Sequence, residues 1–545
     1  MFKPLRFLLR FCLLILVLCL FAPAQGQFKQ VYLPDASTLT GISQFDATGI
    51  IATGLPGKGI AICGSLTGKD TSNTTRQTVY LMQMSELGEP QQLDFFQDTS
   101  SFLLFGPRAY GMTYDGNQNF YMCVGSNDNQ TLLSIDRDGN FRWGHKANHH
   151  EFYSAVMDNG NIVYLGQDES VIGIHDYALA RVDSNGNGGP GMMFGTVDFD
   201  IPKEIISVPD GYVMAGYTFY LGFFNAMVIK CDKQFNLIWS RIYSLPSKDM
   251  TCEDLTASFD GGGYLFTGRT TDLTTGMDSL YIMQLDTGGL LDWFRLYGID
   301  SANKAHVYSL ETDPLGRGYL VCGDYQQSPR FEQAMAFMVD KDGDGVWMRD
   351  YGAGDSATQE ILRDVDIKPD GSYFFSVGEI TEVDSNNQIQ KRMMVVKADL
   401  ETGAIPCDSA LTFGERVTVP IPGGNAHEEP FFAWSRYDFT SWKGEYNNTV
   451  ICSVLVTVDV DLPRENSFSF VNPAAQELVV DYTLTNGPGR LELVDLQGRV
   501  LRQFPLREGI YRERFRLSGF PQGLYFLTAR GDDWKTETKR LIIAY

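Results

Sequence analysis

"EDLTASFDGGGYLFTGRTTDLTTGMDSLYIMQLDTGGLLDWFRLYG" (residues 253–298) holds one complete unit of the pattern that decides the fold of this chain. The unit consists of four short apolar and aromatic runs, each bounded by glycine or aspartate, and such runs are typical of β-strands. No long helical period stands out elsewhere, and 36 Phe and 26 Tyr accompany 55 Gly in the whole chain. The sequence therefore predicts an all-β protein.

The second run of this unit ends in a glycine, and runs of the same kind recur at intervals of about 40–60 residues. Seven such runs end at Gly64, Gly125, Gly166, Gly216, Gly268, Gly323 and Gly378. Another apolar strand follows each of them as the third run of the unit, and four units carry a tryptophan in the fourth run, at Trp143, Trp239, Trp293 and Trp347. Four strands repeated seven times predict a seven-bladed β-propeller over residues 25–411, since sheets stacked around an axis bury each other's faces.

Two segments lie outside this repeat. "FKQVYLP" (28–34) is a single strand-like run before the first unit, and we expect it to pair with the last blade and close the ring. Residues 412–464 keep a strand-like composition but have a different spacing, which predicts a strand-containing linker module.

The amino terminus has the pattern of a secretory signal peptide over residues 1–24. Lys3, Arg6 and Arg10 precede an apolar run, and Ala22-Pro23-Ala24 is a small-residue cleavage pattern. The run is too short to cross a bilayer comfortably and no second one follows, so we expect no transmembrane segment in the mature chain.

Charge and cysteine content limit the class of protein. With 44 Lys and Arg against 67 Asp and Glu, the net charge is −23, which disfavours nucleic acid as a partner because phosphate binding needs a basic surface. The seven cysteines after the leader are too sparse for a disulfide scaffold. Cys63, Cys123 and Cys322 have the setting of buried small side chains, whereas Cys407 and Cys452 are candidates for a pairing that the sequence leaves open.

The carboxy-terminal stretch 465–545 combines four short motifs. They are Asn472-Pro473-Ala474, Asp495-Leu496-Gln497-Gly498-Arg499, Gly523-Leu524-Tyr525 and a last strand that contains Lys539. With this set the stretch resembles the type A C-terminal sorting domain of the type IX secretion system of Bacteroidetes. Its turns and alternating strands predict a sandwich of roughly seven strands. The resemblance implies the type IX machinery as a partner and a destination outside the cell or on its outer surface.

One stretch begins like a calcium-binding loop. Asp340, Asp342 and Asp344 alternate as the first oxygen ligands of such a loop do, and they are the candidate ligands for Ca²⁺ in this chain. The twelfth position, where a bidentate glutamate belongs, is Tyr351, and a strand is expected where a helix should follow. Aspartate and glycine also suit the hairpin expected here, so we favour a turn over a metal site.

The sequence identifies no catalytic or cofactor-binding residue. It contains no nucleophile elbow, zinc-protease motif or phosphate-cradling loop. We expect a secreted or surface-attached propeller that binds a glycan, a protein or a surface polymer through loops held by a rigid ring. Two alternatives stay open: a carbohydrate-active hydrolase or lyase with carboxylates in the propeller funnel, and a structural component of an extracellular assembly.

Overall fold

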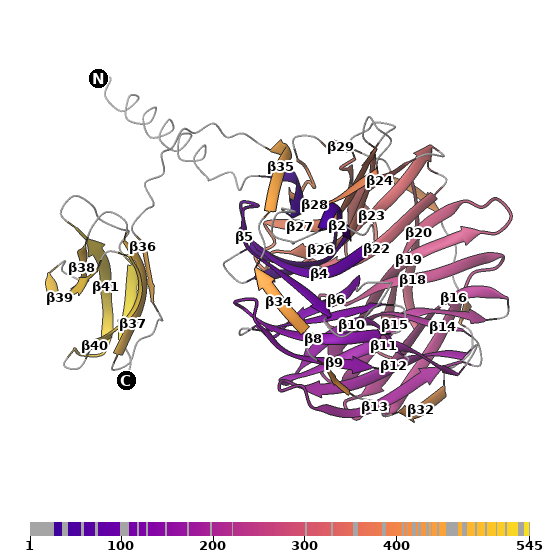
Figure 1. Ribbon diagram of the computed structural model, residues 1–545, viewed down its shortest axis with the longest axis horizontal. Coiled ribbons are helices and arrows are strands. Elements are labelled where there is room, and N and C mark those ends of the chain that lie inside the picture. The colour runs from indigo at the N-terminus through magenta and orange to yellow at the C-terminus, as the bar shows by residue number, and fades with distance from the viewer. Residues whose placement is uncertain are drawn as a thin grey trace, which may run out of the picture. The chain divides into compact units, whose positions relative to one another are not determined.

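The chain forms two compact units, Met1–Val456 and Thr457–Tyr545, in a computed structural model (Figure 1). Every element that the structure describes is a β-strand, and none of the described residues belongs to a helix that could cross a membrane. The described residues are 27–34, 42–55, 59–70, 75–98, 108–116, 119–126, 129–147, 150–171, 174–196, 199–220, 222–299, 302, 304–328, 331–352, 358–383, 389–405, 408–410, 413–416, 421–422, 427–431, 435–437, 439–443, 446–453, 467–470, 477–484, 488–495, 499–507, 509–517, 520–531 and 539–543.

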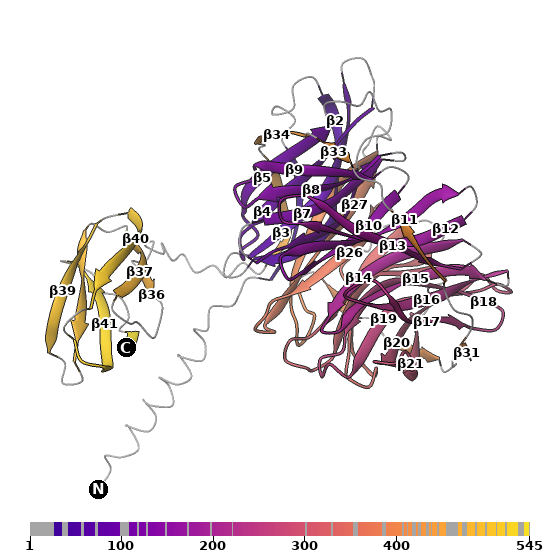
Figure 2. The same ribbon diagram turned by 90° about the horizontal axis from the view of Figure 1, so that it is seen from below.

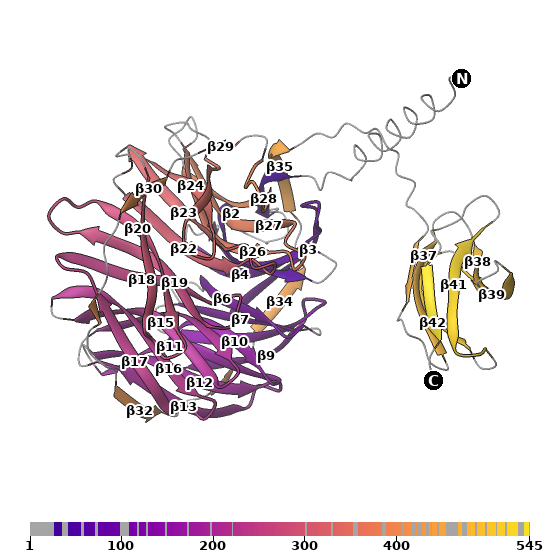
Figure 3. The same cartoon turned by 180° about the vertical axis from the view of Figure 1, so that it is seen from behind.

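Seven sheets make up the first unit in the part of the chain that the structure describes, and in six of them four consecutive strands pair in chain order. The first strands of neighbouring sheets lie next to one another all the way round, so they are innermost and the sheets are the blades of a propeller (Figures 1 and 3). The predicted all-β fold and the seven blades are therefore confirmed.

The first six blades follow the sequence repeat. Blade 1 holds β2 (Ile42–Leu55), β3 (Gly59–Asp70), β4 (Thr75–Met84) and β5 (Pro90–Asp98), blade 2 holds β6 (Arg108–Tyr114), β7 (Asn119–Ser126), β8 (Asn129–Asp136) and β9 (Phe141–Ala147), and blade 3 holds β10 (His150–Asp158), β11 (Asn161–Val171), β12 (Ile174–Asp183) and β13 (Gly188–Gly195). Blade 4 holds β14 (Asp200–Val208), β15 (Gly211–Tyr220), β16 (Phe223–Asp232) and β17 (Leu237–Ser244), blade 5 holds β18 (Lys248–Ala257), β19 (Gly263–Asp272), β20 (Asp278–Asp286) and β21 (Leu291–Ile299), and blade 6 holds β22 (Lys304–Thr312), β23 (Tyr319–Ser328), β24 (Phe331–Val339) and β25 (Gly345–Asp350).

Blade 7 joins the two ends of the ring. Three of its strands come from the last repeat and the fourth from the amino terminus: β26 (Thr358–Ile367), β27 (Tyr373–Val383), β28 (Ile389–Asp399) and β1 (Phe28–Pro34). Phe28 pairs with Lys397 along the antiparallel β1–β28 ladder, so the expected ring closure is confirmed. A buried ion pair fastens this strand, since Lys29 Nζ lies 2.6 Å from Glu360 Oε1 on β26.

A second circuit of the chain runs along the outside of the ring. Seven strands within residues 409–453, which we call the strap, each pair antiparallel with the outermost strand of one blade. They reach blades 6, 5, 4, 3, 2, 1 and 7 in that order, the reverse of the order in which the chain builds the blades. Figure 2 labels three of these strands, β31, β33 and β34. The strap consists of β29 (Ser409–Ala410), β30 (Phe413–Arg416), β31 (Ile421–Pro422), β32 (His427–Phe431), β33 (Ser435–Tyr437), β34 (Phe439–Lys443) and β35 (Tyr446–Ser453).

The region from which the sequence predicted a linker module, 412–464, thus contributes six strands to the blades, β30 to β35. Each pairing satisfies a row of backbone N–H and C=O groups at the outer edge of a blade, where an unpaired strand would invite pairing with another chain.

Aromatic side chains of blades 2, 4, 5 and 6 donate hydrogen bonds to the turn that follows the third strand of the next blade. The indole N–H donates to a hairpin carbonyl at 3.1 Å in three cases: Trp143 to Ser184, Trp239 to Thr287 and Trp347 to Leu400. Tyrosine hydroxyls donate to the hairpin glycine carbonyl at 2.6–2.7 Å in three more: Tyr243 to Gly289, Tyr297 to Gly343 and Tyr351 to Gly403. The three cysteines predicted to be buried, Cys63, Cys123 and Cys322, are so. Four tyrosines at the start of the second strand of a blade are buried as well: Tyr212, Tyr264, Tyr319 and Tyr373.

The second unit is a small sandwich of two antiparallel sheets. One has the order β36-β37-β40 and the other β39-β38-β41-β42, which gives the seven strands expected from the sequence among the residues that the structure describes. Their apolar side chains form one buried cluster between the sheets. The strands are β36 (Ser467–Phe470), β37 (Glu477–Leu484), β38 (Gly489–Val494), β39 (Val500–Leu506), β40 (Gly509–Arg516), β41 (Gly523–Arg530) and β42 (Lys539–Ile543).

Candidate binding site at the propeller axis

Each innermost strand carries a β-bulge at the same place. One residue is skipped in the pairing between the first and second strand of every blade. In six blades the residue before it pairs with the glycine that the sequence repeat had marked. The bulge explains the glycine: a Cβ on Gly268 would lie 1.9 Å from the carbonyl oxygen of Thr251.

A β-bulge re-aims a side chain, and here it aims one side chain per blade at the axis. All seven skipped residues are half-buried, whereas the residue before each is buried. Because they lie on the innermost strands, they line the centre of the ring. We call them the axial ring: Ile50, Tyr110, Tyr153, Lys203, Glu253, Tyr308 and Arg363.

Members of the axial ring contact one another across the blade boundaries. Three pairs are close: the Tyr110 and Tyr153 rings with centroids 6.3 Å apart, Lys203 Nζ and Glu253 Oε2 at 2.7 Å, and the Arg363 guanidinium 4.6 Å from the Tyr308 ring centroid. Burial opposes the charge of Lys203, but Glu253 and Tyr217 together with smaller contributions outweigh it and hold the pKa of the ammonium above its ordinary value. The ring therefore presents aromatic faces next to fixed charges of both signs.

In blades 5 and 7 the residue after the bulge connects the blade to the next one. Asp254 Oδ2 accepts the backbone N–H of Leu310 at 2.5 Å, and Asp364 Oδ2 accepts that of Ala52 at 2.8 Å. Each N–H belongs to the residue two positions after the bulge residue of the next blade. The same contact is therefore made at both blade boundaries. Burial raises the pKa of Asp364 to about 7 and also raises that of Asp254. These carboxylates lie next to the axial ring in sequence, and their hydrogen bonds join neighbouring blades.

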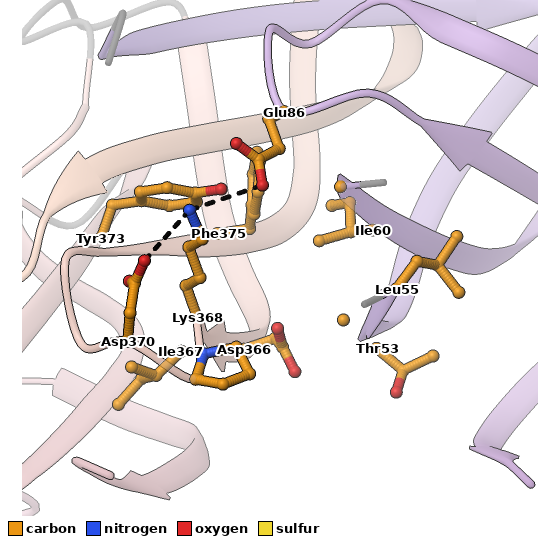
Figure 4. A pocket seen from close by; sticks show the side chains of 13 residues that line it. Thr53, Leu55, Ile60, Glu86, Asp366, Ile367, Lys368, Asp370, Tyr373 and Phe375 are labelled. Carbon is orange, nitrogen blue, oxygen red and sulfur yellow. Dashed lines mark ion pairs between the residues drawn. The ribbon is translucent and has the colours of Figure 1, made fainter. Parts of the chain in front are cut away.

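A cavity of about 430 Å³ lies between blade 7 and blade 1, on the side of the β2–β3 and β26–β27 hairpins (Figure 4). We call it the seam pocket. Leu55 and Ile60 of blade 1 form one wall, and Tyr373 and Phe375 of blade 7 form the facing wall. The other lining residues are Thr53, Gly54, Gly59, Glu86, Asp366, Ile367, Lys368, Pro369 and Asp370.

The candidate calcium ligands lie in the hairpin between β24 and β25. Asp340 Oδ1 accepts the backbone N–H groups of Asp342 and Asp344, each at 2.9 Å. Asp342 Oδ2 lies 2.6 Å from the ammonium of Lys341, and its side chain is 61% exposed. Among the residues that the structure describes, no three His, Cys, Asp or Glu side chains are placed to hold a metal ion. The geometry of Asp340 is that of a turn, in which the carboxylate closes its own hairpin.

The sorting motifs occupy the turns and the last strand of the small sandwich. Arg499 donates from its backbone N–H and from Nε to the two oxygens of Asp495, at 2.9 and 2.7 Å, across the hairpin. Tyr525, two residues after Gly523, donates its hydroxyl to the carbonyl of Pro521 at 2.8 Å.

Lys539 of β42 reaches the other sheet, where Nζ donates to the carbonyl of Phe468 at 2.7 Å. Some predicted residues lie outside the described part of the chain: Asn472, Pro473, Gly498, the leader 1–24, Cys407 and the side chain of Cys452.

Sequence reasoning missed the axial ring, although the signal for it was present. The bulge residue directly follows the partner of the repeated glycine, and that glycine was recognised as a mark of the second strand only. Reading it as a site where two backbones approach closely points to a bulge on the neighbouring strand. The seam pocket has no such signal, because its two walls come from opposite ends of the propeller sequence.

Comparisons with known proteins identify one part of the chain directly. Residues 470–544 match the family described as the secretion system C-terminal sorting domain. No curated protein matches the sequence significantly.

Several solved structures are similar in fold. A subtype N11 neuraminidase-like protein of A/flat-faced bat/Peru/033/2010 (H18N11) is 10% identical, with 70% of this chain and 95% of that chain covered and a TM-score of 0.36. The Synechocystis apocarotenoid oxygenase is 9% identical, with 71% and 96% covered and a TM-score of 0.38. PorZ of Porphyromonas gingivalis, a surface component of the type IX secretion system, is 8% identical, with 93% and 100% covered and a TM-score of 0.23.

The matched motifs and the seven-stranded sandwich that carries them agree with the expectation from the sequence. The carboxy-terminal unit of this chain belongs to the sorting-domain family of type IX secretion, and the chain is a β-propeller protein that this system exports to the cell surface or the exterior.

Proposed function

We propose that the propeller is an extracellular binding module and that the axial ring is its binding site for a glycan. The observation that carries this proposal is the pattern of the side chains at the bulge position. Three tyrosines, two cations, one carboxylate and one isoleucine occupy it. Tyrosine and arginine are enriched at binding sites because they offer a large contact area with a polar end.

The comparison between blades supports the same site. Positions that hold the propeller together repeat from blade to blade, as the hairpin glycines and the tryptophans do. The bulge position keeps its backbone geometry in all seven blades while its side chain changes from Ile50 to Tyr153 to Glu253. A fixed scaffold with a varied side chain facing a shared centre is what recognition of an irregular ligand requires.

The experiment is a glycan-array screen of the mature full-length chain, followed by titration of the best ligand. The double variant Tyr153→Ala/Tyr308→Ala removes two aromatic faces, and we expect its affinity to fall about tenfold or more. Tyr308→Phe keeps the ring and is the matched control, with an expected change of less than about threefold. Unchanged affinity in a folded double variant would place the ligand elsewhere and contradict the proposal.

The same titration separates binding from turnover. If the ligand returns intact after prolonged incubation, the binding module is supported. Release of a shortened or unsaturated sugar would instead favour the carbohydrate-active alternative. In that alternative the carboxylates of Asp254 and Asp364 act on the bound glycan.

A further inference from the structure

The seam pocket is a second cavity with a composition of its own, separate from the axial ring. Its long walls are apolar, with Leu55 and Ile60 facing Tyr373 and Phe375 (Figure 4). A volume of about 430 Å³ lies within the range of small-molecule sites. The walls come from the first and the last blade, so the pocket exists only in the closed ring.

The outer end of the pocket is electrically balanced. Lys368 Nζ lies 3.5 Å from Glu86 Oε1 and 3.2 Å from Asp370 Oδ2. Lys397 Nζ donates to the carbonyl of Glu86 at 2.7 Å and lies 4.0 Å from the Tyr373 ring centroid. Both lysines therefore have partners already, and a ligand at this end gains no free charge.

At the inner end of the pocket, Asp366 adds a third carboxylate to the lining, while the one lining ammonium, that of Lys368, pairs with Glu86 and Asp370. Asp366 lines it and accepts a hydrogen bond from the backbone N–H of Gly54. Burial raises the pKa of Asp366 to about 6. Burial, and then the charges of Asp366 and Asp364, raise the pKa of Glu311 on β22 to about 8. The charged neighbours that act on Glu311 are all acids. Among the residues that the structure describes, neither Glu311 nor Asp366 forms an ion pair, and a buried carboxylate without a cation is costly.

We infer that the seam pocket binds a small organic cation, an ammonium or guanidinium group on an apolar body, with the cation at Asp366 and the body between the Leu55–Ile60 and Tyr373–Phe375 walls. The cation compensates the inner carboxylates, and the apolar body fills the space between two apolar walls. An aromatic body suits the Tyr373 and Phe375 rings best. The inference is independent of the glycan site, since it concerns a different cavity and a different ligand chemistry.

The test is calorimetric titration of the mature full-length chain with three probes of one shape. Phenethylammonium carries the cation, 2-phenylethanol is neutral, and 3-phenylpropionate is an anion. We expect measurable binding of the cation, at least tenfold weaker binding of the alcohol and no binding of the anion. Bound cation should also raise the melting temperature, because it joins blade 1 to blade 7. Equal affinity for the cation and the alcohol, or no binding of the cation, would overturn the inference.

A pair of variants locates the site. Asp366→Asn keeps an acceptor for the Gly54 N–H but removes the charge, and we expect the affinity for phenethylammonium to fall about tenfold, as for loss of a hydrogen bond to a charged group. Asp342→Asn removes one exposed carboxylate far along the chain and should change the affinity less than about twofold. An unchanged affinity in Asp366→Asn would exclude the assigned site.

A second readout needs no variant. Asp366 loses its charge below its pKa of about 6, and its charge in turn contributes to the raised pKa values of Glu311 and Asp364. Affinity for the cation should therefore fall steadily as the pH is lowered from about 8 to about 5, while weak binding of the alcohol stays constant. A flat pH profile for the cation would contradict the inference. Titration with N-acetyl-lysine methylamide then shows whether a lysine side chain of a protein can serve as the cation. If this compound binds more tightly than phenethylammonium, the natural ligand is assigned as a lysine side chain of a protein.

Discussion

At the scale of the residue, Gly343 gives the aspartate-rich hairpin at 340–344 a structural role. Gly343 has φ +82°, and a Cβ there would lie 2.7 Å from Cζ3 of Trp293 in the preceding blade. Gly160 has nearly the same φ, +79°, but nothing lies within 4 Å of its Cβ position. Substitution of Gly160 therefore tests backbone strain alone, whereas substitution of Gly343 tests backbone strain together with the contact between blades.

We expect Gly160→Ala to lower the free energy of unfolding by about 1–2 kcal/mol, the cost of a left-handed backbone for alanine. Gly343→Ala should lose a further 1–3 kcal/mol, roughly the cost of overpacking a tight contact. Urea denaturation followed by tryptophan fluorescence measures both. Equal losses in the two variants would mean that the hairpin does not seat on the tryptophan.

A second residue-scale expectation concerns Glu311 and pH. Its folded-state pKa, raised to about 8 by burial and then by Asp366 and Asp364, exceeds the ordinary value, so the folded state binds more protons than the unfolded state between about pH 4.5 and pH 8. Stability from this group is present at low pH and is lost as the pH rises through about 8. Glu311→Gln should therefore melt about 1–3 °C higher than the parent chain at about pH 9 and nearly the same at about pH 5. The difference between the two pH values is the quantity to measure by calorimetry, and Asp342→Asn, which alters an exposed acid, should show none.

At the scale of the element, β1 is the strand on which ring closure depends. Its Lys29 is buried, with Nζ 2.6 Å from both Glu360 Oε1 and the carbonyl oxygen of Tyr351. Lys29→Met removes the cation beside a buried carboxylate, and we expect a loss of about 3–5 kcal/mol in the free energy of unfolding. The double variant Lys29→Met/Glu360→Gln removes both charges and should recover much of that loss. If the single variant is as stable as the parent, the ion pair does not hold β1 in place.

At the scale of the whole molecule, the strap makes the propeller a ring of five-stranded blades. Each strap strand covers the outer edge of a blade, and an uncovered edge is a template for pairing with another chain. Deletion of residues 413–453 should therefore leave a protein that associates with itself as its concentration rises. Light scattering after size exclusion measures this directly, and a monomer that melts like the parent chain would contradict the role of the strap.

Much of this architecture could be predicted from the sequence, because its signals are local and repeated. The glycine-ended strands gave the blade count, and the strand at 28–34 gave the closure. The strap was beyond reach, since its strands are short, β31 being Ile421–Pro422, and their partners lie far away in sequence. The axial ring was hidden for another reason: a regular period assigns alternating faces, and a bulge breaks that alternation. The seam pocket requires Asp366 and Gly54 to meet across the closed ring, a separation that no local pattern encodes.

The position of β35 also determines how the propeller carries mechanical load. The chain leaves the ring from β35, whose partner is β1, the strand that closes blade 7. A pull on the carboxy-terminal side, such as tension on a surface-attached chain, reaches the β35–β1 ladder first and β34 on blade 1 next. Tension would thus detach the strap strands one blade at a time before it reaches the four-stranded blades. The strap can therefore lengthen under load while the rest of the propeller stays folded.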